Sequence, residues 1–367
     1  MLWLLALLLA AMAAGQAFVL IRFQPLGLDF LPLWTAGRMA WADPGRVYDF
    51  AAVTHAQAWL LPGLKWLRPF AYPPTALVVL APLGRLPFWA ALALWCGLGA
   101  GVFLWASLAL AARRPWLTAA LAMLAPAAVV GLIAGQSALL VAGLAGVAMV
   151  QLAPRPRLAG ALLAMAAAIK PQALLLAPLA LAACGAWEAL FAAGLTEAAL
   201  VALSLVLFGP ARWAEWLACL PRFQAVIAAT PSLVAGLITP AALALALGLA
   251  GAAAELWRAL FALAAVALVW RTFARPSTPA LRLAALGVGG LMVSPYALVY
   301  DAALLVPAAA ALAASAGEGR DGTWRVLGFV AACAAATPGI GPLAVLGFAA
   351  LTAFEPRSAR TAMPEPV

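Results

Sequence analysis

Long apolar runs separated by short polar breaks follow one another along almost the whole chain. Three of the longest are Met1–Ile21, Phe88–Ala112 and Trp187–Phe208. A helix needs about 20 apolar residues to cross a hydrocarbon core about 30 Å thick, whereas the strands of a membrane barrel alternate over about ten residues. The pattern therefore predicts an all-α integral membrane protein, a polytopic bundle of about 10–13 transmembrane helices.

Shorter apolar runs complete this bundle, which we place in residues 88–356. Leu233–Trp270 leaves two alternatives open, because it has room for two crossings, but two would put Arg271 on the same side as Lys170. Either Leu233–Gly251 is re-entrant or interfacial, or Arg271 breaks the pattern. The other crossings are expected at Trp116–Ala134, Ala138–Ala153, Leu158–Ile169 and Ala173–Cys184, and Trp324–Phe354 is expected to form a hairpin broken at 338–342.

The stretch Gly27–Pro74 is the longest one that a bilayer core would reject. It carries Asp29, Asp43 and Asp49 and the only histidine, His55. Because it follows a first crossing at residues 1–22, we expect residues 23–87 to form an extracytoplasmic loop with interfacial helices. These helices are predicted at Leu31–Ala42, at Phe50–Leu61 before Pro62-Gly63, and at Thr75–Leu83.

Composition agrees with the pattern. The chain is 67% hydrophobic and 9% charged, whereas a soluble domain is about 45–50% apolar and about 25% charged. Its net charge of +9 does not indicate nucleic-acid binding, because the basic residues are scattered in pairs between apolar runs. We expect a single multi-pass domain in the plasma membrane, with membrane lipids and no nucleic acid among its partners.

The basic pairs also predict the orientation, because lysine and arginine concentrate in cytoplasmic loops. Five polar features then share the extracytoplasmic face, where we expect the functional site: Gly27–Pro74, Gln136, Lys170, Ala211–Ser232, which is interpreted as a second polar loop, and Ser294–Asp301. The cytoplasmic groups are Arg113/Arg114, Arg155/Arg157, Arg271/Arg275/Arg282, Arg320/Arg325 and Arg357/Arg360, the last in a tail over 357–367.

Several residues of that face are candidates for chemistry, and each also has a structural interpretation. Lys170, one of two lysines, ends an apolar run before Pro171, so it is either a hydrated helix end or a phosphate partner. Gln136 either caps a helix or contacts substrate, and Asp301 either interacts with a helix dipole or belongs to the site. Asp29 follows the first crossing among apolar neighbours, where a carboxylate could act as a general base.

Six short motifs in this order resemble the C-type glycosyltransferases, specifically glycosyltransferase family 87, the polyprenol-phosphate-mannose-dependent mannosyltransferase-like proteins. Each motif is weak alone, and their order over residues 28–301 carries the likeness. The motifs are Leu28-Asp29-Phe30 with Trp34 and Gly37, Asp43-Pro44 with Tyr48, Phe70-Ala71-Tyr72-Pro73-Pro74, Gly135-Gln136-Ser137, Ile169-Lys170-Pro171-Gln172 and Ser294-Pro295-Tyr296.

The resemblance implies a membrane enzyme that transfers mannose or a similar hexose from a polyprenyl-phosphate donor to a lipid or glycan acceptor. It makes Asp29 the catalytic base and Lys170, helped by Arg68, the partner of the donor phosphate. Family members often carry a histidine shortly after the Ser-Pro motif, and Tyr300 stands in that region here. The remaining expected substrate-binding residues are Tyr72, Gln136, Ser294, Tyr300 and Asp301.

No cofactor follows from the motifs. The chain has no Asp-x-Asp cluster, so we do not predict a divalent metal, although some C-type enzymes use one. A lipid-linked saccharide flippase is the main alternative, because transporters also carry polar residues and broken helices at membrane depth. A membrane assembly protein without catalysis is the second alternative.

Overall fold

A computed structural model describes residues 2–58, 60, 68–317 and 319–354. These residues form helices joined by short turns, and within them the only strand-like pairing is an isolated bridge between Leu237 and Leu298. The all-α prediction is therefore confirmed. The predicted helix end at Pro62-Gly63 and the predicted tail at 357–367 lie outside the described residues.

Four of the described helices are long and apolar enough to cross a membrane, and a bent pair makes a fifth candidate span. Twenty-two residues rise about 33 Å, which matches the hydrocarbon thickness. Six shorter apolar helices join them, so the estimate of 10–13 crossings stays a prediction. The long helices are α1 (Leu2–Phe23), α5 (Phe88–Leu110), α11 (Trp187–Phe208) and α15 (Gly251–Phe273), and the bent pair is α6 (Pro115–Leu124) with α7 (Pro126–Ala134).

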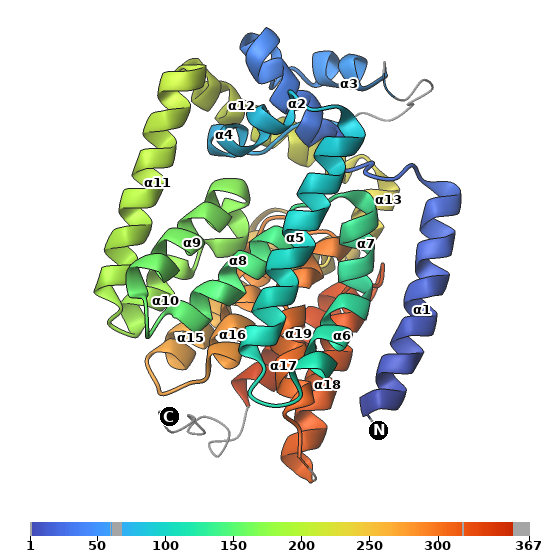
Figure 1. Ribbon diagram of the computed structural model, residues 1–367, viewed down its shortest axis with the longest axis vertical. Coiled ribbons are helices and arrows are strands. Elements are labelled where there is room, and N and C mark those ends of the chain that lie inside the picture. Colours follow the sequence, from blue (N-terminus) through green and yellow to red (C-terminus); the bar gives the residue numbers. More distant parts are fainter. Residues whose placement is uncertain (1, 59, 61–67, 318, 355–367) are drawn as a thin grey trace.

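The centre of the bundle consists of helices that are apolar on every side, as expected for helices surrounded by other helices. Alanine and glycine dominate these buried surfaces, so the backbones pack closely. In Figure 1, α1 and α11 stand on opposite flanks of this centre. The central helices are α8 (Ala138–Gln151), α16 (Pro279–Val293) and α17 (Val306–Ala314), with α9 (Pro156–Ile169), α18 (Arg320–Ala334) and α19 (Gly341–Ala353) beside them.

Short helices gather at one end of the bundle, the upper end in Figure 1, away from the start of α1. Three of them occupy the predicted interfacial segments: α2 (Leu31–Ala42), α3 (Phe50–Ala58) and α4 (Pro74–Leu83). The fourth is α12 (Ala211–Ala228), so the interpretation of this stretch as a loop is wrong. Charged residues made it look like a loop, although its apolar residues repeat at helical spacing.

Two other segments differ from a simple series of crossings. Residues 116–134 form the pair α6 and α7, bent by 60° because Pro126 has no backbone N–H to continue the first helix. The ambiguous stretch contains α13 (Pro231–Ala235) and α14 (Pro240–Ala246), both too short to span, before the long α15. This arrangement favours the alternative with a single crossing there.

Proline also divides the segment after Lys170, where η2 (Pro171–Leu174) precedes α10 (Ala177–Ala183). The chain after α16 likewise forms a short 3-10 helix, η3 (Val299–Leu304), before α17. The predicted C-terminal hairpin is confirmed, since α18 and α19 pack against each other across a turn. These breaks place backbone turns, rather than continuous helices, around one cavity.

Candidate functional site

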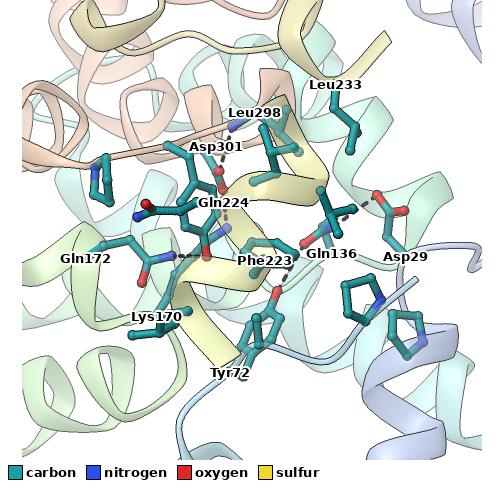
Figure 2. A pocket seen from close by; sticks show the side chains of 18 of the residues that line it. Asp29, Tyr72, Gln136, Lys170, Gln172, Phe223, Gln224, Leu233, Leu298 and Asp301 are labelled. Atoms are coloured by element: carbon teal, nitrogen blue, oxygen red, sulfur yellow. Dashed lines mark hydrogen bonds and ion pairs between the residues drawn. The ribbon is translucent and has the colours of Figure 1, made fainter. Parts of the chain in front are cut away.

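A cavity of about 790 Å³ opens at the end of the bundle where the short helices gather. All five polar features predicted to share a membrane face contribute to its walls: the loop after α1 with the irregular stretch before α4, Gln136, Lys170, α12 with the start of α13, and the segment from Pro295 to Asp301. The structure thus brings these five features together around one cavity, and their shared position on one membrane face stays a prediction. Figure 2 shows Asp29 on one side of the pocket and Lys170 with Gln172 on the other.

Asp29 lies in a turn between α1 and α2 that is fixed to the end of α7. The backbone N–H of Asp29 donates to the carbonyl of Ala134 at 2.9 Å, and that of Gly27 donates to Ile133 at 2.9 Å. The turn thus satisfies helix-end carbonyls that have no partner inside α7. Gly135 ends α7 with a φ of +73°, a left-handed conformation that glycine adopts without strain.

The Asp29 carboxylate holds two partners from distant segments. Arg68 donates from Nη1 to Oδ1 at 2.7 Å, and Gln136 donates from Nε2 to Oδ2 at 3.0 Å. Both side chains of the ion pair keep about a quarter of their surface exposed, 26% for Asp29 and 25% for Arg68. The carboxylate is therefore oriented by fixed donors and remains accessible from the cavity.

Tyr72 connects this carboxylate to the rest of the pocket wall. Its hydroxyl lies 3.4 Å from Oε1 of Gln136 and 3.3 Å from Oγ of Ser137. The Tyr48 hydroxyl donates to the Tyr72 carbonyl at 2.9 Å, which holds the backbone of Tyr72 in place. Burial raises the pKa of the Tyr72 phenol above its usual value, although the nearby Lys170 ammonium acts in the opposite direction. The phenol thus stays neutral and able to donate.

Lys170 caps α9 and is paired with Asp301 from η3. Both side chains are buried, with 7% and 4% of their surface exposed. The second oxygen of Asp301 accepts the backbone N–H of Leu298 at 3.0 Å, and the Lys170 ammonium lies 5.3 Å from the centre of the Tyr300 ring. The contact with the Leu298 N–H at the start of η3 agrees with the structural role considered for Asp301, whereas its ion pair with Lys170 was not predicted.

Ser294 is the one predicted site residue that does not line the cavity. It is buried, and its hydroxyl donates to the carbonyl of Tyr296 at 2.5 Å. Its contact orients the neighbouring segment, where the Tyr296 hydroxyl lies 3.5 Å from Nε2 of Gln172. Gln172 and Tyr296 do line the cavity; both stand in the motifs quoted above, but neither was named as a site residue.

Sequence reasoning placed residues 211–232 on the side of the site but missed which side chains of α12 line the cavity. Trp216, Leu220, Phe223 and Gln224 of this helix line the cavity, and Trp216 donates to the carbonyl of Ala71 at 3.1 Å. Their spacing places all four on one helical face. That periodicity was the available signal, and the charged residues between them obscured it.

The pocket offers polar and charged groups against apolar walls. Two carboxylates and two cations line it, so the charged side chains described there balance. Among the residues that the structure describes, no group of three histidine, cysteine, aspartate or glutamate side chains gathers to hold a metal ion. The arrangement can accept a proton at Asp29, and Arg68 can contact an anion, because its side chain lines the cavity and stays about one quarter exposed.

The sequence profile of glycosyltransferase family 87 matches residues 70–295, more than half of the chain. The chain belongs to glycosyltransferase family 87. Family membership makes it a membrane glycosyltransferase, and the apolar helices make it a multi-pass membrane protein. No curated protein and no solved structure matches the chain.

The family match includes part of the pocket and excludes another part. Tyr72, Gln136 and Lys170 lie inside the matched residues, whereas Asp29 and Asp301 lie outside them. The geometry joins the two sets, because Gln136 donates to Asp29 and Lys170 pairs with Asp301. The cavity is therefore a single site built from matched and unmatched segments of a family 87 chain.

Proposed function

We propose that this family 87 protein transfers a hexose such as mannose from a polyprenyl-phosphate donor to a hydroxyl group of a lipid or glycan acceptor. Asp29 acts as the general base in this proposal, and Arg68 and Lys170 contact the donor phosphate. Tyr72, Gln136, Tyr300 and Asp301 complete the substrate-binding wall, and Ser294 supports it from behind. No metal or other cofactor has a step in the proposed reaction.

The reaction balances with these groups alone. The acceptor oxygen attacks the anomeric carbon of the donor sugar, and the bond between that carbon and the phosphate oxygen breaks. Polyprenyl phosphate leaves with the bonding electrons, and Asp29 takes the proton of the acceptor hydroxyl. A phosphate is already a good leaving group, so positive charge from Arg68 and Lys170 is enough to stabilise it and no general acid is needed.

The environment of Asp29 is the observation that carries this proposal. A base must reach the proton it removes and must be held in a fixed orientation. Asp29 is oriented by Arg68 and Gln136 and stays about one quarter exposed to the cavity. The apolar part of the wall, including Leu220 and Phe223, offers the contact area that a lipid-linked substrate requires.

Asp29→Asn tests the base directly, because it keeps the shape of the side chain and removes the proton acceptor. General-base catalysis is worth about 10²–10⁴-fold, so turnover with a polyprenyl-phosphate sugar should fall at least that far. Binding of the donor should persist, because Lys170 is untouched. The measurement is sugar transfer by the purified protein in detergent or vesicles, with donor binding measured separately.

Asp49→Asn is the matched control. Asp49 lies outside the pocket, and its Oδ1 caps the start of α3 by accepting from Ala51 and Ala52 at 3.0 and 3.1 Å. Asparagine also caps helices well, so transfer should stay near the wild-type rate. Normal transfer by Asp29→Asn would contradict the assignment of the base. If the wild type transfers no sugar but moves intact lipid across the bilayer, the flippase alternative is favoured. If the wild type shows neither of these two activities, the assembly protein is favoured.

We further propose that the pocket faces the outside of the plasma membrane. The basic pairs support this orientation, since Arg113 and Arg114 follow α5, whose other end begins beside α4 at the pocket end of the bundle. A single cysteine at position 114 should react with an impermeant reagent only from the cytoplasmic side, and one at 136 only from the opposite side. Equal labelling of both positions from one side would contradict the orientation.

A further inference from the structure

Helices α2 and α4 cross at a point where two glycines meet. Gly37 of α2 lies against the backbone of Leu80 and Gly84, and Gly84 in turn lies against the backbone of Gly37 and Arg38. A Cβ at either glycine would collide with the other segment, so the absence of side chains lets the two backbones touch. The residues that follow the glycines, Arg38 and Arg85, are therefore held on neighbouring positions of one surface.

Each of these arginines stacks on a tryptophan of α2. The guanidinium carbon of Arg38 lies 5.0 Å from the centre of the Trp34 ring, and that of Arg85 lies 3.8 Å from the centre of the Trp41 ring. The two indoles are fixed by hydrogen bonds to the α4 segment, from Trp34 to the Leu86 carbonyl at 3.0 Å and from Trp41 to the Ala81 carbonyl at 2.7 Å.

The spacing along α2 makes this a continuous feature. Trp34, Arg38 and Trp41 are separated by four and three residues, so they lie along one face of the helix. Arg85 reaches Trp41 from the end of α4. Arginine and tryptophan side chains thus alternate along this face, with Trp34 buried beneath Arg38. We name it the Arg38–Arg85 surface and define it by Trp34, Arg38, Trp41 and Arg85.

Neither arginine of this surface has a carboxylate partner or a side-chain hydrogen bond within the described part of the chain. Three arginines of the same end of the molecule do: Arg46 lies near Asp43 and Asp49, Arg68 pairs with Asp29, and Arg212 pairs with Glu215. Arg38 and Arg85 are both exposed. Two neighbouring positive charges are therefore left without compensation.

Stacking orients these two guanidinium groups without using their donors. Each guanidinium carbon lies over an indole ring, a contact that uses no N–H donor and so leaves the planar fork of donors free for bidentate contact with a phosphate. Trp41 is 46% exposed, and exposed tryptophans concentrate at the depth of lipid headgroups. The ligand that this chemistry fits is a phosphate located at the membrane surface.

We propose that the Arg38–Arg85 surface binds the phosphate of an anionic lipid headgroup and anchors α2 and α4 to the membrane surface. A lipid is favoured over a free phosphate because the surface lies on helices whose apolar residues fit an interfacial position, and because exposed indole surface is available to the acyl region. This site is separate from the cavity, since none of its four residues lines the cavity.

The test uses the whole protein purified in detergent and titrated with phosphatidylglycerol or phosphatidylcholine, with bound lipid counted by native mass spectrometry. The wild type should retain phosphatidylglycerol in preference to phosphatidylcholine. Arg38→Gln/Arg85→Gln should bind phosphatidylglycerol about tenfold more weakly, because two charge-assisted contacts are lost. Arg38→Lys/Arg85→Lys should lie between the two, because lysine keeps the charge and loses the bidentate geometry.

Arg46→Gln is the matched control, because Arg46 is an exposed arginine of the same loop with acidic neighbours at 4.0 and 3.9 Å. It should retain phosphatidylglycerol like the wild type, and the single Arg85→Gln variant gives a milder second measurement. The proposal would be overturned if the wild type retained both lipids equally, or if the double variant bound phosphatidylglycerol as tightly as the wild type. It would also be overturned if Arg46→Gln lost as much phosphatidylglycerol binding as the double variant. Inorganic phosphate that binds as tightly as phosphatidylglycerol, and loses this binding in the double variant, would make a free anion the ligand.

Discussion

Two ion pairs line the same pocket, yet they differ in how much of each side chain the cavity can reach. Arg68 and Asp29 keep 25% and 26% of their side-chain surface exposed, whereas Lys170 and Asp301 keep 7% and 4%. The first pair joins segments 39 residues apart, and the second joins segments 131 residues apart. An open pair therefore holds a local loop, and a buried pair holds two distant parts of the bundle.

The difference matters because burial changes what an ion pair does. A partly hydrated pair can exchange one partner for a substrate group at modest cost, because water and the ligand replace the lost contact. A buried pair has already lost its hydration, so removal of one partner leaves an unpaired charge in an environment of low dielectric constant. We infer that the Asp29 pair is suited to chemistry and the Lys170 pair to holding the pocket together.

This comparison changes the interpretation of Lys170. At the sequence level it is a free ammonium at a broken helix end, whereas in the fold Asp301 already neutralises it. A donor phosphate has to approach a lysine that keeps its carboxylate partner or to displace that partner. Loss of transfer after substitution of Lys170 would therefore combine an effect on the donor with an effect on the fold, and the two must be measured separately.

The largest effect on stability is expected for Lys170→Ala. Because Asp301 would stay buried without a partner, the free energy of unfolding should fall by about 3–5 kcal/mol. Donor binding should weaken roughly ten- to a hundredfold, as expected for the loss of a charge-assisted phosphate contact, and Lys170→Arg should keep part of it. Denaturant unfolding in mixed micelles and donor titration measure the two quantities.

A double variant separates them. Lys170→Met/Asp301→Leu removes both charges and leaves apolar side chains of similar size, an exchange that is often neutral for stability. It should regain most of the stability and still bind the donor weakly, if Lys170 contacts the phosphate. Full recovery of donor binding together with stability would mean that Lys170 only holds the fold, and the donor role would be wrong.

Much of the fold could be predicted from the sequence, because apolar length and proline positions act locally. The long helices α5 and α11, the short helices α2 and α4, and the C-terminal hairpin all follow from these signals. The departures had local causes as well. The charged residues of α12 concealed its helical periodicity, and the bend at Pro126 within an expected crossing was not foreseen.

The pocket could be predicted only in part, for a different reason. Alternation of basic pairs and polar turns indicates which segments share an end of the bundle, so the convergence of Asp29, Gln136 and Lys170 could be foreseen. Which side chains pair cannot be read from one sequence, because Lys170 and Asp301 meet only after the segments between them have packed. The same holds for the contact of Arg68 with Asp29.

A substitution in the exposed Arg68–Asp29 pair should affect stability less than one in the buried Lys170–Asp301 pair, and its effect on sugar transfer should be easier to interpret. Arg68→Gln removes the charge beside Asp29 and leaves a polar but shorter side chain at a partly hydrated position, so the free energy of unfolding should change by about 1 kcal/mol or less. The efficiency of transfer, kcat/KM, should fall roughly ten- to a hundredfold, which corresponds to the loss of about 1.5–3 kcal/mol from a charged hydrogen bond. Steady-state transfer assays and thermal unfolding of the same preparation check both values.

Arg68→Lys sharpens this last prediction, because lysine supplies a point charge and lacks the forked donors of arginine. If Arg68 acts through its charge on the donor phosphate, the lysine variant should recover most of the lost kcat/KM. If it acts by orienting Asp29 through Nη1, the lysine variant should stay impaired in kcat while its KM for the donor is near normal. An unfolding energy that drops as far as in Lys170→Ala would contradict the distinction between the open and the buried pair.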